Sequence, residues 1–281
     1  MPDKNLMENV KKLREMTGVG FKDCKIALEE SKGDIEKSIE YLRKKGIAKA
    51  SKKMDRSASE GLIIATEKKG EVTIVEINSE TDFVAKNKDF INFCKEISEL
   101  NFECKGDLEK LKKMTMKNNS TVEENLINLI SKIGEKITIR RSKYFDNKSG
   151  TNFYYVHSSL EKDIGKIISV VKLSEENKKL GQMIAMHIAA SNPLAIKKEG
   201  IEKNLVDKEL EIIKAELINS GKTGELAEKI SKGKINKYIS DNTLLDQIWI
   251  MDPKKKVSDI LKENKKDKEI EVLDFVRYKV G

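Results

Sequence analysis

The sequence has few of the side chains that build catalytic and metal sites. It contains two histidines, His157 and His187, which fall on different predicted elements, and three cysteines with no C-x-x-C spacing. An odd number of widely spaced thiols indicates neither a disulfide framework nor a zinc site. Cys24 has no histidine in its own module to activate it as a nucleophile, and we interpret it as helix packing. We therefore predict reduced thiols, no bound metal or cofactor, and no enzymatic activity.

Aromatic residues make up 5% of the chain, and no apolar run approaches the roughly 18 residues of a membrane-spanning helix. The N-terminal segment MPDKNLMENVKKL lacks the apolar stretch of a signal peptide. Charged residues make up 36%, which favours helices with solvated faces over a β-sandwich. These features predict a soluble, largely helical, cytoplasmic protein of two or three modules without a membrane partner.

The net charge of +8 arises from 55 Lys and Arg residues against 47 Asp and Glu residues. Acidic residues are interspersed along the chain, so the basic excess forms no long block with aromatic residues between. A Lys-rich solvated surface is therefore favoured over a nucleic-acid-binding face. We expect no direct, specific nucleic-acid partner.

The first fifty residues predict three short amphipathic helices. The stretches NLMENVKKLREM, FKDCKIALEES and DIEKSIEYLRKK repeat apolar residues at helical spacing and are separated by TGVG and KGD. Asp34 suits the N-cap of the third helix, and Gly46 suits its end. We predict a three-helix domain over residues 1–50, followed by a polar linker over residues 51–60.

From Gly61 the pattern changes to that of strands. GLIIATE and EVTIVEIN are β-branched runs around a short turn, which predicts a hairpin, and SETDFVAKNKDFINFCKEISEL returns to helical spacing. Further strands are predicted in EKITIRRSKYF, FYYVHSS, IGKIISVVKL and EIEVLDFVRYKV, with a helix in SEENKKLGQMIAMHIAAS. The strand-strand-helix order occurs twice, so we predict an α+β core of two parts, each with a small antiparallel sheet. The parts are residues 61–134, and residues 135–202 with 240–281.

Residues 203–239 predict an antiparallel helical hairpin inserted into the second part. Its apolar positions form one stripe, and SGKTG joins its two helices. The string GKT at Gly221–Thr223 does not match a phosphate loop, because Glu216 occupies the place of the first glycine and no strand precedes it. We predict a tight turn there. His187, in the preceding helix pattern, is predicted to be buried or half-buried.

The turn Thr81-Asp82-Phe83-Val84 follows a predicted strand. Thr81 suits an N-cap of the following turn, and Asp82 would either accept backbone N–H bonds or engage a partner. Two interpretations of the aromatic residue are open from the local pattern. The local pattern favours packing of Phe83 and Val84 onto the following helix, and the alternative is that Phe83 points outward as a contact for another protein.

Three stretches in order, LREMTGVGFKDCKIALEESKGDIEKSIEYLRKKG, TDFVAKN and AMHIAASNP, resemble the bacterial elongation factor Ts family. GKINKYISDNTLLDQIWIMDPKKKVSDILKE and VLDFVRYKV are similar to later segments of that family, so the resemblance covers most of the chain. It implies a UBA-like three-helix N-terminal domain, a two-part α+β core and an inserted hairpin that serves dimer contacts in some members. It also implies a partner, elongation factor Tu, whose GDP is exchanged for GTP through disturbance of the Mg²⁺ and phosphate site.

The resemblance implies roles for particular residues of the turn. Asp82 and Phe83 match residues that press against the GTPase helices flanking the metal site, and Thr81 and Val84 complete the motif. The partner would be bound in its GDP-bound and nucleotide-free states. A homodimer through the hairpin would give a 2:2 complex.

Two further contact regions are implied by the resemblance. Arg14, Phe21 and Lys22 match contacts of the first bundle with the GTPase domain, although the local pattern equally allows Phe21 to pack inside the bundle. His157 matches a contact at the end of a strand, but HSSLEKDIG replaces the shorter glycine-containing turn of the family.

Two other classes of function remain open from the residues. A basic RNA- or ribosome-binding protein without exchange activity would use the Lys-rich hairpin, and its affinity for RNA would fall steeply with salt. A structural scaffold built on the hairpin would leave the first bundle and the core without a role.

Overall fold

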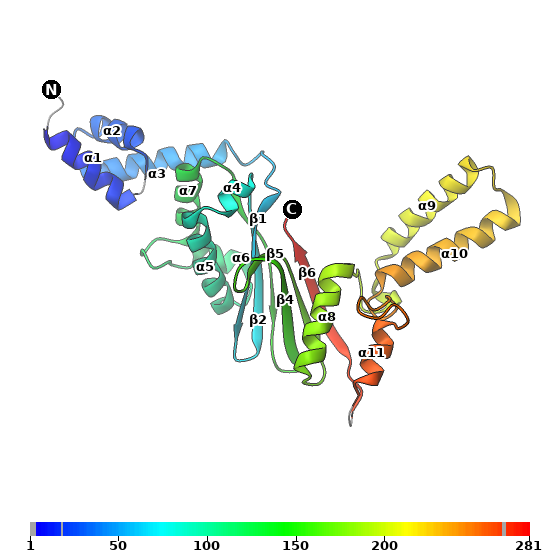
Figure 1. Ribbon diagram of the computed structural model, residues 1–281. Helices are drawn as coiled ribbons and strands as arrows, with labels where there is room; N and C mark the ends of the chain where they lie inside the picture. Colours follow the sequence, from blue (N-terminus) through cyan, green and yellow to red (C-terminus); the bar gives the residue numbers. More distant parts are fainter. Residues whose placement is uncertain (1–3, 18, 266–267) are drawn as a thin grey trace.

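The computed structural model describes residues 4–17, 19–265 and 268–281, which form an elongated α+β architecture (Figure 1). A helical bundle lies at one end, an antiparallel sheet with its covering helices in the middle, and a helical hairpin at the other end. Residues 1–3 of the predicted N-terminal domain and Gly18 of the predicted TGVG turn lie outside the described residues. No helix in the described part of the chain has the length and apolar character needed to cross a membrane.

The N-terminal bundle consists of α1 (Lys4–Thr17), α2 (Phe21–Glu30) and α3 (Ile35–Ser51). Its own small apolar core includes the fully buried Leu13 and Leu28. The three predicted helices are therefore present and pack on one another.

The third helix begins as predicted and ends later than predicted. Asp34 caps it by accepting a backbone N–H of the first turn at 3.0 Å. The prediction that Gly46 ends this helix is wrong, because α3 continues to Ser51. A Cβ atom at Gly46 would lie 3.6 Å from Cγ2 of Ile127 in α7 (Val122–Ile133), so the small residue allows α3 to pack closely on α7.

The strands form one six-stranded antiparallel sheet with the order β3-β2-β1-β5-β4 and with β6 beside β5. The prediction of two separate small sheets is wrong, because β1 pairs with β5 through Ile63 opposite Gly165 and Ile64 opposite Ile164. Alternating hydrophobicity shows which face of a strand is buried but does not identify a distant neighbour. The strands are β1 (Glu60–Lys68), β2 (Glu71–Ser79), β3 (Ile137–Phe145), β4 (Thr151–Glu161), β5 (Ile164–Leu173) and β6 (Val272–Lys279).

The third strand, which we predicted in the second part of the core, pairs with β2 along its whole length. Its basic side chains also reach β6, a strand that pairs with β5 and not with β3. Arg141 Nη2 donates to the carbonyl of Lys279 at 3.1 Å, and Lys143 Nζ lies 2.8 Å from Asp274 Oδ1. Side chains of β3 and β6 therefore meet, and both strands contribute to one apolar core.

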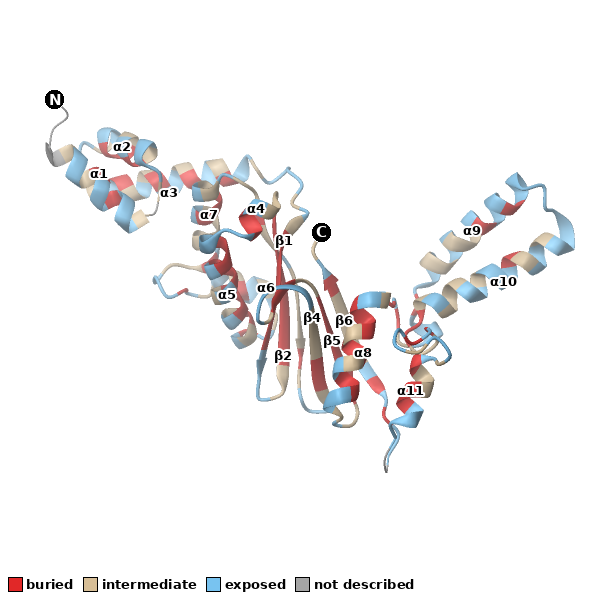
Figure 2. Cartoon of the chain, in the orientation of Figure 1, coloured by how far each residue is buried: buried red, intermediate tan, exposed pale blue. Residues whose placement is uncertain are grey.

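Helices cover the sheet in two groups. Side chains from α4 (Asp82–Ala85), α5 (Lys88–Glu103), α6 (Leu108–Lys113) and α7 form one core with β1, β2 and β3. A second core lies against β4, β5 and β6 and includes α8 (Lys178–Ser191) and α11 (Val257–Glu263). Figure 2 shows buried residues on the strands and on the inner faces of α5 and α8.

His187 is fully buried in α8, which confirms the prediction of a buried helix residue. Its ring stacks on Trp249 with 5.1 Å between the ring centroids, and its Nε2 atom lies 3.0 Å from Oε1 of Gln247. Burial lowers the pKa of His187. The residue therefore joins α8 to the loop that follows the hairpin.

The helical hairpin consists of α9 (Lys203–Asn219) and α10 (Gly224–Asn242), preceded by a short 3₁₀ turn, η1 (Lys198–Gly200). The GKT string begins in the connection between the two helices, as predicted. Ile213 and Leu217 of α9 are buried, whereas most of the hairpin surface is exposed or half-buried (Figure 2).

Candidate functional site

The chain turns from β2 into the four-residue helix α4, and this turn exposes an aromatic side chain. Phe83 is 79% exposed, whereas its neighbours Val84 and Ala85 are buried in the core beneath α5. Of the two interpretations left open, packing onto the following helix is therefore wrong for Phe83 and correct for Val84. Single exposed apolar side chains are common on protein surfaces, so the position of the backbone beneath this one is the informative feature.

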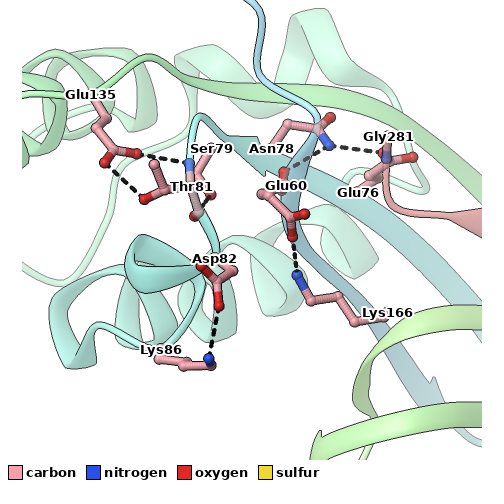
Figure 3. Close-up of polar contacts among 10 residues, drawn as sticks. All are labelled: Glu60, Glu76, Asn78, Ser79, Thr81, Asp82, Lys86, Glu135, Lys166 and Gly281. Atoms are coloured by element: carbon pink, nitrogen blue, oxygen red, sulfur yellow. Dashed lines mark hydrogen bonds and ion pairs between the residues drawn. The ribbon is translucent and has the colours of Figure 1, made fainter.

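Every polar group of Thr81 is hydrogen-bonded (Figure 3). Its N–H donates to Oε2 of Glu135 at 3.0 Å, and its hydroxyl donates to Oε1 of the same carboxylate at 2.8 Å. Its carbonyl accepts the hydroxyl of Ser79 at 3.0 Å. The prediction that the Thr81 side chain caps the following turn is wrong, because the hydroxyl is directed to Glu135 instead.

Glu80, the neighbour of Thr81, in turn accepts a hydrogen bond from Lys136, the neighbour of Glu135. Its Oε1 atom accepts the backbone N–H of Lys136 at 2.5 Å, and Nη1 of Arg56 lies 3.3 Å from its Oε2 atom. These donors, the Lys136 N–H first among them, hold the pKa of Glu80 below its usual value. We call Glu80, Thr81, Glu135 and Lys136 the carboxylate clamp. It joins the turn after β2 to the segment that leads into β3.

The carboxylate of Asp82 faces solvent beside Phe83. Oδ2 of Asp82 lies 2.8 Å from Nζ of Lys86, one helical turn later. This pair lowers the pKa of Asp82 and raises the pKa of Lys86. Lys166 and Glu60 form a second, half-buried pair nearby, at 2.6 Å (Figure 3). Exposed or half-exposed pairs of this kind contribute at most about 1 kcal/mol, so they place charge near the turn without fixing it.

The predicted contact residues of the bundle lie on its surface, at the end of α1 and the start of α2. Arg14 is in the last turn of α1, and Phe21 and Lys22 begin α2. All three are exposed, and Phe21, at 43%, is outside the apolar core of the bundle. The interpretation that Phe21 packs inside the bundle is therefore wrong. The structure does not bring these residues to the Thr81 turn, because α3 and α7 lie between (Figure 1).

His157 lies within β4 rather than at the end of a strand, because β4 continues to Glu161. Its side chain is exposed, and its Nδ1 atom lies 3.5 Å from the hydroxyl of Tyr155. The segment HSSLEKDIG thus lengthens β4 and turns into β5, with a register shift between Ser159 and Glu161. His157 does not join the turn at Phe83.

The thiols are buried. Cys24, Cys94 and Cys104 are free, and burial raises the pKa of each one. A buried thiol with a raised pKa is a poor nucleophile, and the packing role predicted for Cys24 is confirmed. Within the ranges that the structure describes, no three His, Cys, Asp or Glu side chains are grouped so as to hold a metal ion.

Comparison with known proteins agrees with the motifs quoted from the sequence. The family model described as Elongation factor TS matches residues 80–281. The chain belongs to the elongation factor Ts family. It is 41% identical over 280 residues to Elongation factor Ts of Methylorubrum extorquens (strain PA1), an alignment that covers 97% of this chain and 91% of that protein.

Other members of the elongation factor Ts family are similarly related. Elongation factor Ts of Clostridium kluyveri is 40% identical, with 97% of this chain and 91% of that protein covered. Elongation factor Ts of Maricaulis maris is 38% identical, with 97% and 90% covered. The family resemblance is therefore confirmed, and the protein is a translation elongation factor. The matched region begins at Glu80, so it includes the whole clamp.

Three residues of this site, Glu80, Glu135 and Lys136, were not predicted. Glu80 precedes the TDFVAKN motif, but a single Glu beside a turn carries no distinctive signal. Glu135 follows the glycine that ends a helix, 54 residues after Thr81. Periodicity and capping patterns extend over a few residues, so they do not reveal this contact.

Proposed function

We propose that this member of the elongation factor Ts family binds elongation factor Tu with GDP and promotes exchange of GDP for GTP. The observation that supports this function is the exposed ring of Phe83 on a turn whose backbone is tied down on both sides. An exposed aromatic side chain on a fixed backbone is suited to insertion into a partner. In this proposal the protein acts in the cytoplasm, together with its partner GTPase.

Exchange of this kind requires no covalent chemistry. A protein that binds the nucleotide-free state of a GTPase more tightly than the nucleotide-bound state weakens nucleotide binding by the same factor. GTPases hold their nucleotide partly through Mg²⁺, which bridges phosphate oxygens and protein ligands. Phe83 would press between the helices that flank this metal site, with Asp82 beside it, and would displace the metal ligands. The protein is then an exchange factor that acts by binding and not an enzyme.

The size of the effect follows from burial of the ring. Complete burial of a Phe side chain contributes roughly 1.5–3 kcal/mol. Since about 1.4 kcal/mol corresponds to a factor of ten, this one contact accounts for a tenfold to hundredfold preference for the nucleotide-free state.

Three further assignments complete the proposal. The UBA-like bundle contacts the GTPase domain through Arg14, Phe21 and Lys22, all of which are exposed. His157, whose side chain is exposed within β4, contacts a separate part of the partner. The hairpin of α9 and α10 mediates a homodimer and thus a 2:2 complex, without a specific nucleic-acid partner.

Release of fluorescent GDP from elongation factor Tu tests the proposed function. Addition of this protein should accelerate release strongly, and Phe83→Ala should reduce that acceleration about tenfold or more. The melting temperature should stay nearly unchanged, because the ring makes few contacts within the fold. Ile248→Ala is the matched control, since it removes another exposed apolar side chain, in the loop between α10 and α11 and outside the proposed contact regions. If saturating wild-type protein fails to accelerate release, the proposed function is wrong.

A further inference from the structure

The position of Glu135 depends on the end of α7. Gly134 follows this helix with φ of 86° and donates its N–H to the carbonyl of Ile130 at 2.9 Å. Left-handed backbone at this position favours glycine, because other L-residues are strained there. The change of direction ends the helix and places the next residue opposite the turn at Thr81. Glu135 is thus presented by a rigid helix end and by the start of β3.

The contact between Glu135 and Thr81 constrains the turn more than one hydrogen bond would. Both oxygens of the carboxylate are engaged, one by the backbone N–H and one by the hydroxyl of the same residue. Two bonds from one rigid group to two donors restrict rotation as well as distance. Hydrogen bonds to an ionised carboxylate are also stronger than bonds between neutral groups.

The short helix that carries Phe83 has few means of holding its own direction. α4 spans only Asp82–Ala85, and isolated helices of one turn are unstable because nucleation is costly. On its C-terminal side, burial of Val84 and Ala85 anchors the backbone. On its N-terminal side, the hydrogen bonds of Thr81 anchor the backbone. The ring of Phe83 is too exposed to anchor it. The direction in which the ring leaves the core therefore depends on the clamp.

We propose that Glu135 is a positioning residue for exchange, because its two-point contact with Thr81 sets the direction of Phe83 before the partner is met. This inference rests on the proposed function. A turn that is ordered in advance does not lose conformational entropy on binding, whereas a loose turn must be ordered in the complex. Glu80 supports the same arrangement from the other side by holding the N–H of Lys136.

Four variants separate positioning from simple stability. Glu135→Ala removes both acceptors, and Thr81→Val removes the hydroxyl while keeping nearly the same shape. Glu135→Gln keeps an oxygen for the Thr81 N–H and adds an N–H that the Thr81 hydroxyl accepts. Thr81→Ser keeps the hydroxyl. Glu263→Ala is a control, because it removes a carboxylate from an exposed ion pair of α11 that lies outside the clamp.

Two measurements are made on the full-length variants. The first, without any partner, is amide hydrogen exchange at Asp82–Ala85, which should become about tenfold faster in Glu135→Ala and Thr81→Val. The second is the maximum rate of GDP release from elongation factor Tu, which should fall about fivefold in the same two variants. Glu135→Gln, Thr81→Ser and the control should stay within about twofold of the wild type in both measurements, with similar melting temperatures.

The outcomes distinguish the two proposals. If Glu135→Ala and Thr81→Val leave amide exchange and GDP release at wild-type values, the role of Glu135 is refuted while the proposed function stands. If the wild type does not accelerate release, the proposed function fails, and amide exchange alone decides whether the clamp orders the turn. Should Glu135→Ala not fold, Thr81→Val carries the test. A loss of release that Glu135→Gln and Thr81→Ser share with the disruptive variants would also contradict positioning.

Discussion

The turn at Phe83 and the hairpin of α9 and α10 both expose large apolar side chains, but the backbone beneath them is held differently. Phe83 is 79% exposed, and Ile218 of the hairpin is 67% exposed. The turn is bonded to a segment 54 residues away, whereas the hairpin helices pack mainly on each other through a single stripe. An exposed apolar residue becomes a contact of defined direction only where the rest of the fold fixes its backbone. The hairpin surface has more freedom to adapt to a partner.

We expect the largest effects on stability from truncation of a buried side chain near the Phe83 turn and of one in the hairpin. Phe90, in the first turn of α5 beneath the Phe83 turn, is fully buried, and Phe90→Ala should lower the free energy of unfolding by about 3–5 kcal/mol. Leu217→Ala, the counterpart in the hairpin, should mainly increase local opening of α9 and α10, because few contacts join them to the core. Denaturant unfolding combined with amide hydrogen exchange measures both. Faster exchange of the β1 and β2 amides in Leu217→Ala would contradict independence of the hairpin.

Removal of the hairpin tests whether the hairpin is independent of the core that holds the Phe83 turn. The chain enters and leaves the hairpin at neighbouring points, where the N–H of Leu244 donates to the carbonyl of Ala195 at 2.8 Å. Replacement of residues 203–241 by a short Gly-Ser linker should shift the melting temperature of the core by no more than roughly 2–4 °C, which corresponds to about 1 kcal/mol.

Self-association should disappear in this hairpin-deletion variant, as measured by sedimentation. A dimer that persists without the hairpin would place the contact between copies elsewhere in the molecule.

Acid should loosen the turn and leave the hairpin largely unaffected. The pKa of Glu80 is lowered in the fold, so the stabilisation is present above the pKa of the unfolded state. It is lost as the pH falls from the unfolded-state pKa of a Glu, about 4.3, through the lower pKa of the folded state. Relative to the hairpin amides, the turn amides should exchange faster in this range. Glu80→Gln should remove much of this response, and an equal acid response in both proteins would contradict the assignment to Glu80.

The smallest expected effects concern the exposed pair of Asp82 and Lys86. Asp82→Asn and Lys86→Met should each change the free energy of unfolding by less than about 1 kcal/mol, because exposed pairs are screened by water. Their effects on the partner should differ. If Asp82 contacts elongation factor Tu, Asp82→Asn slows GDP release about threefold and Lys86→Met leaves it unchanged. Equal rates in the two variants would show that Asp82 only balances the charge of Lys86.

The sequence alone determined the features that depend on neighbouring residues. Apolar periodicity predicted the helices of the bundle, the strands around the turn after Lys68 and the two arms of the hairpin. The cap at Asp34, the burial of His187 and the position of Gly221–Thr223 in the connection between two helices were predicted correctly for the same reason. Ordered motifs also determined the family.

Only the tertiary structure decided which distant segments meet. The pairing of Ile63 with Gly165 joins strands that we predicted in separate sheets, and Gly46 lies inside α3 where this helix packs on α7. The exposure of Phe83 and the contact between Thr81 and Glu135 could not be predicted from the sequence either, because local sequence patterns extend over only one or two helical turns. Long-range contacts are selected by the packing of the whole chain, which fixes both the backbone of the turn and the direction of its aromatic side chain.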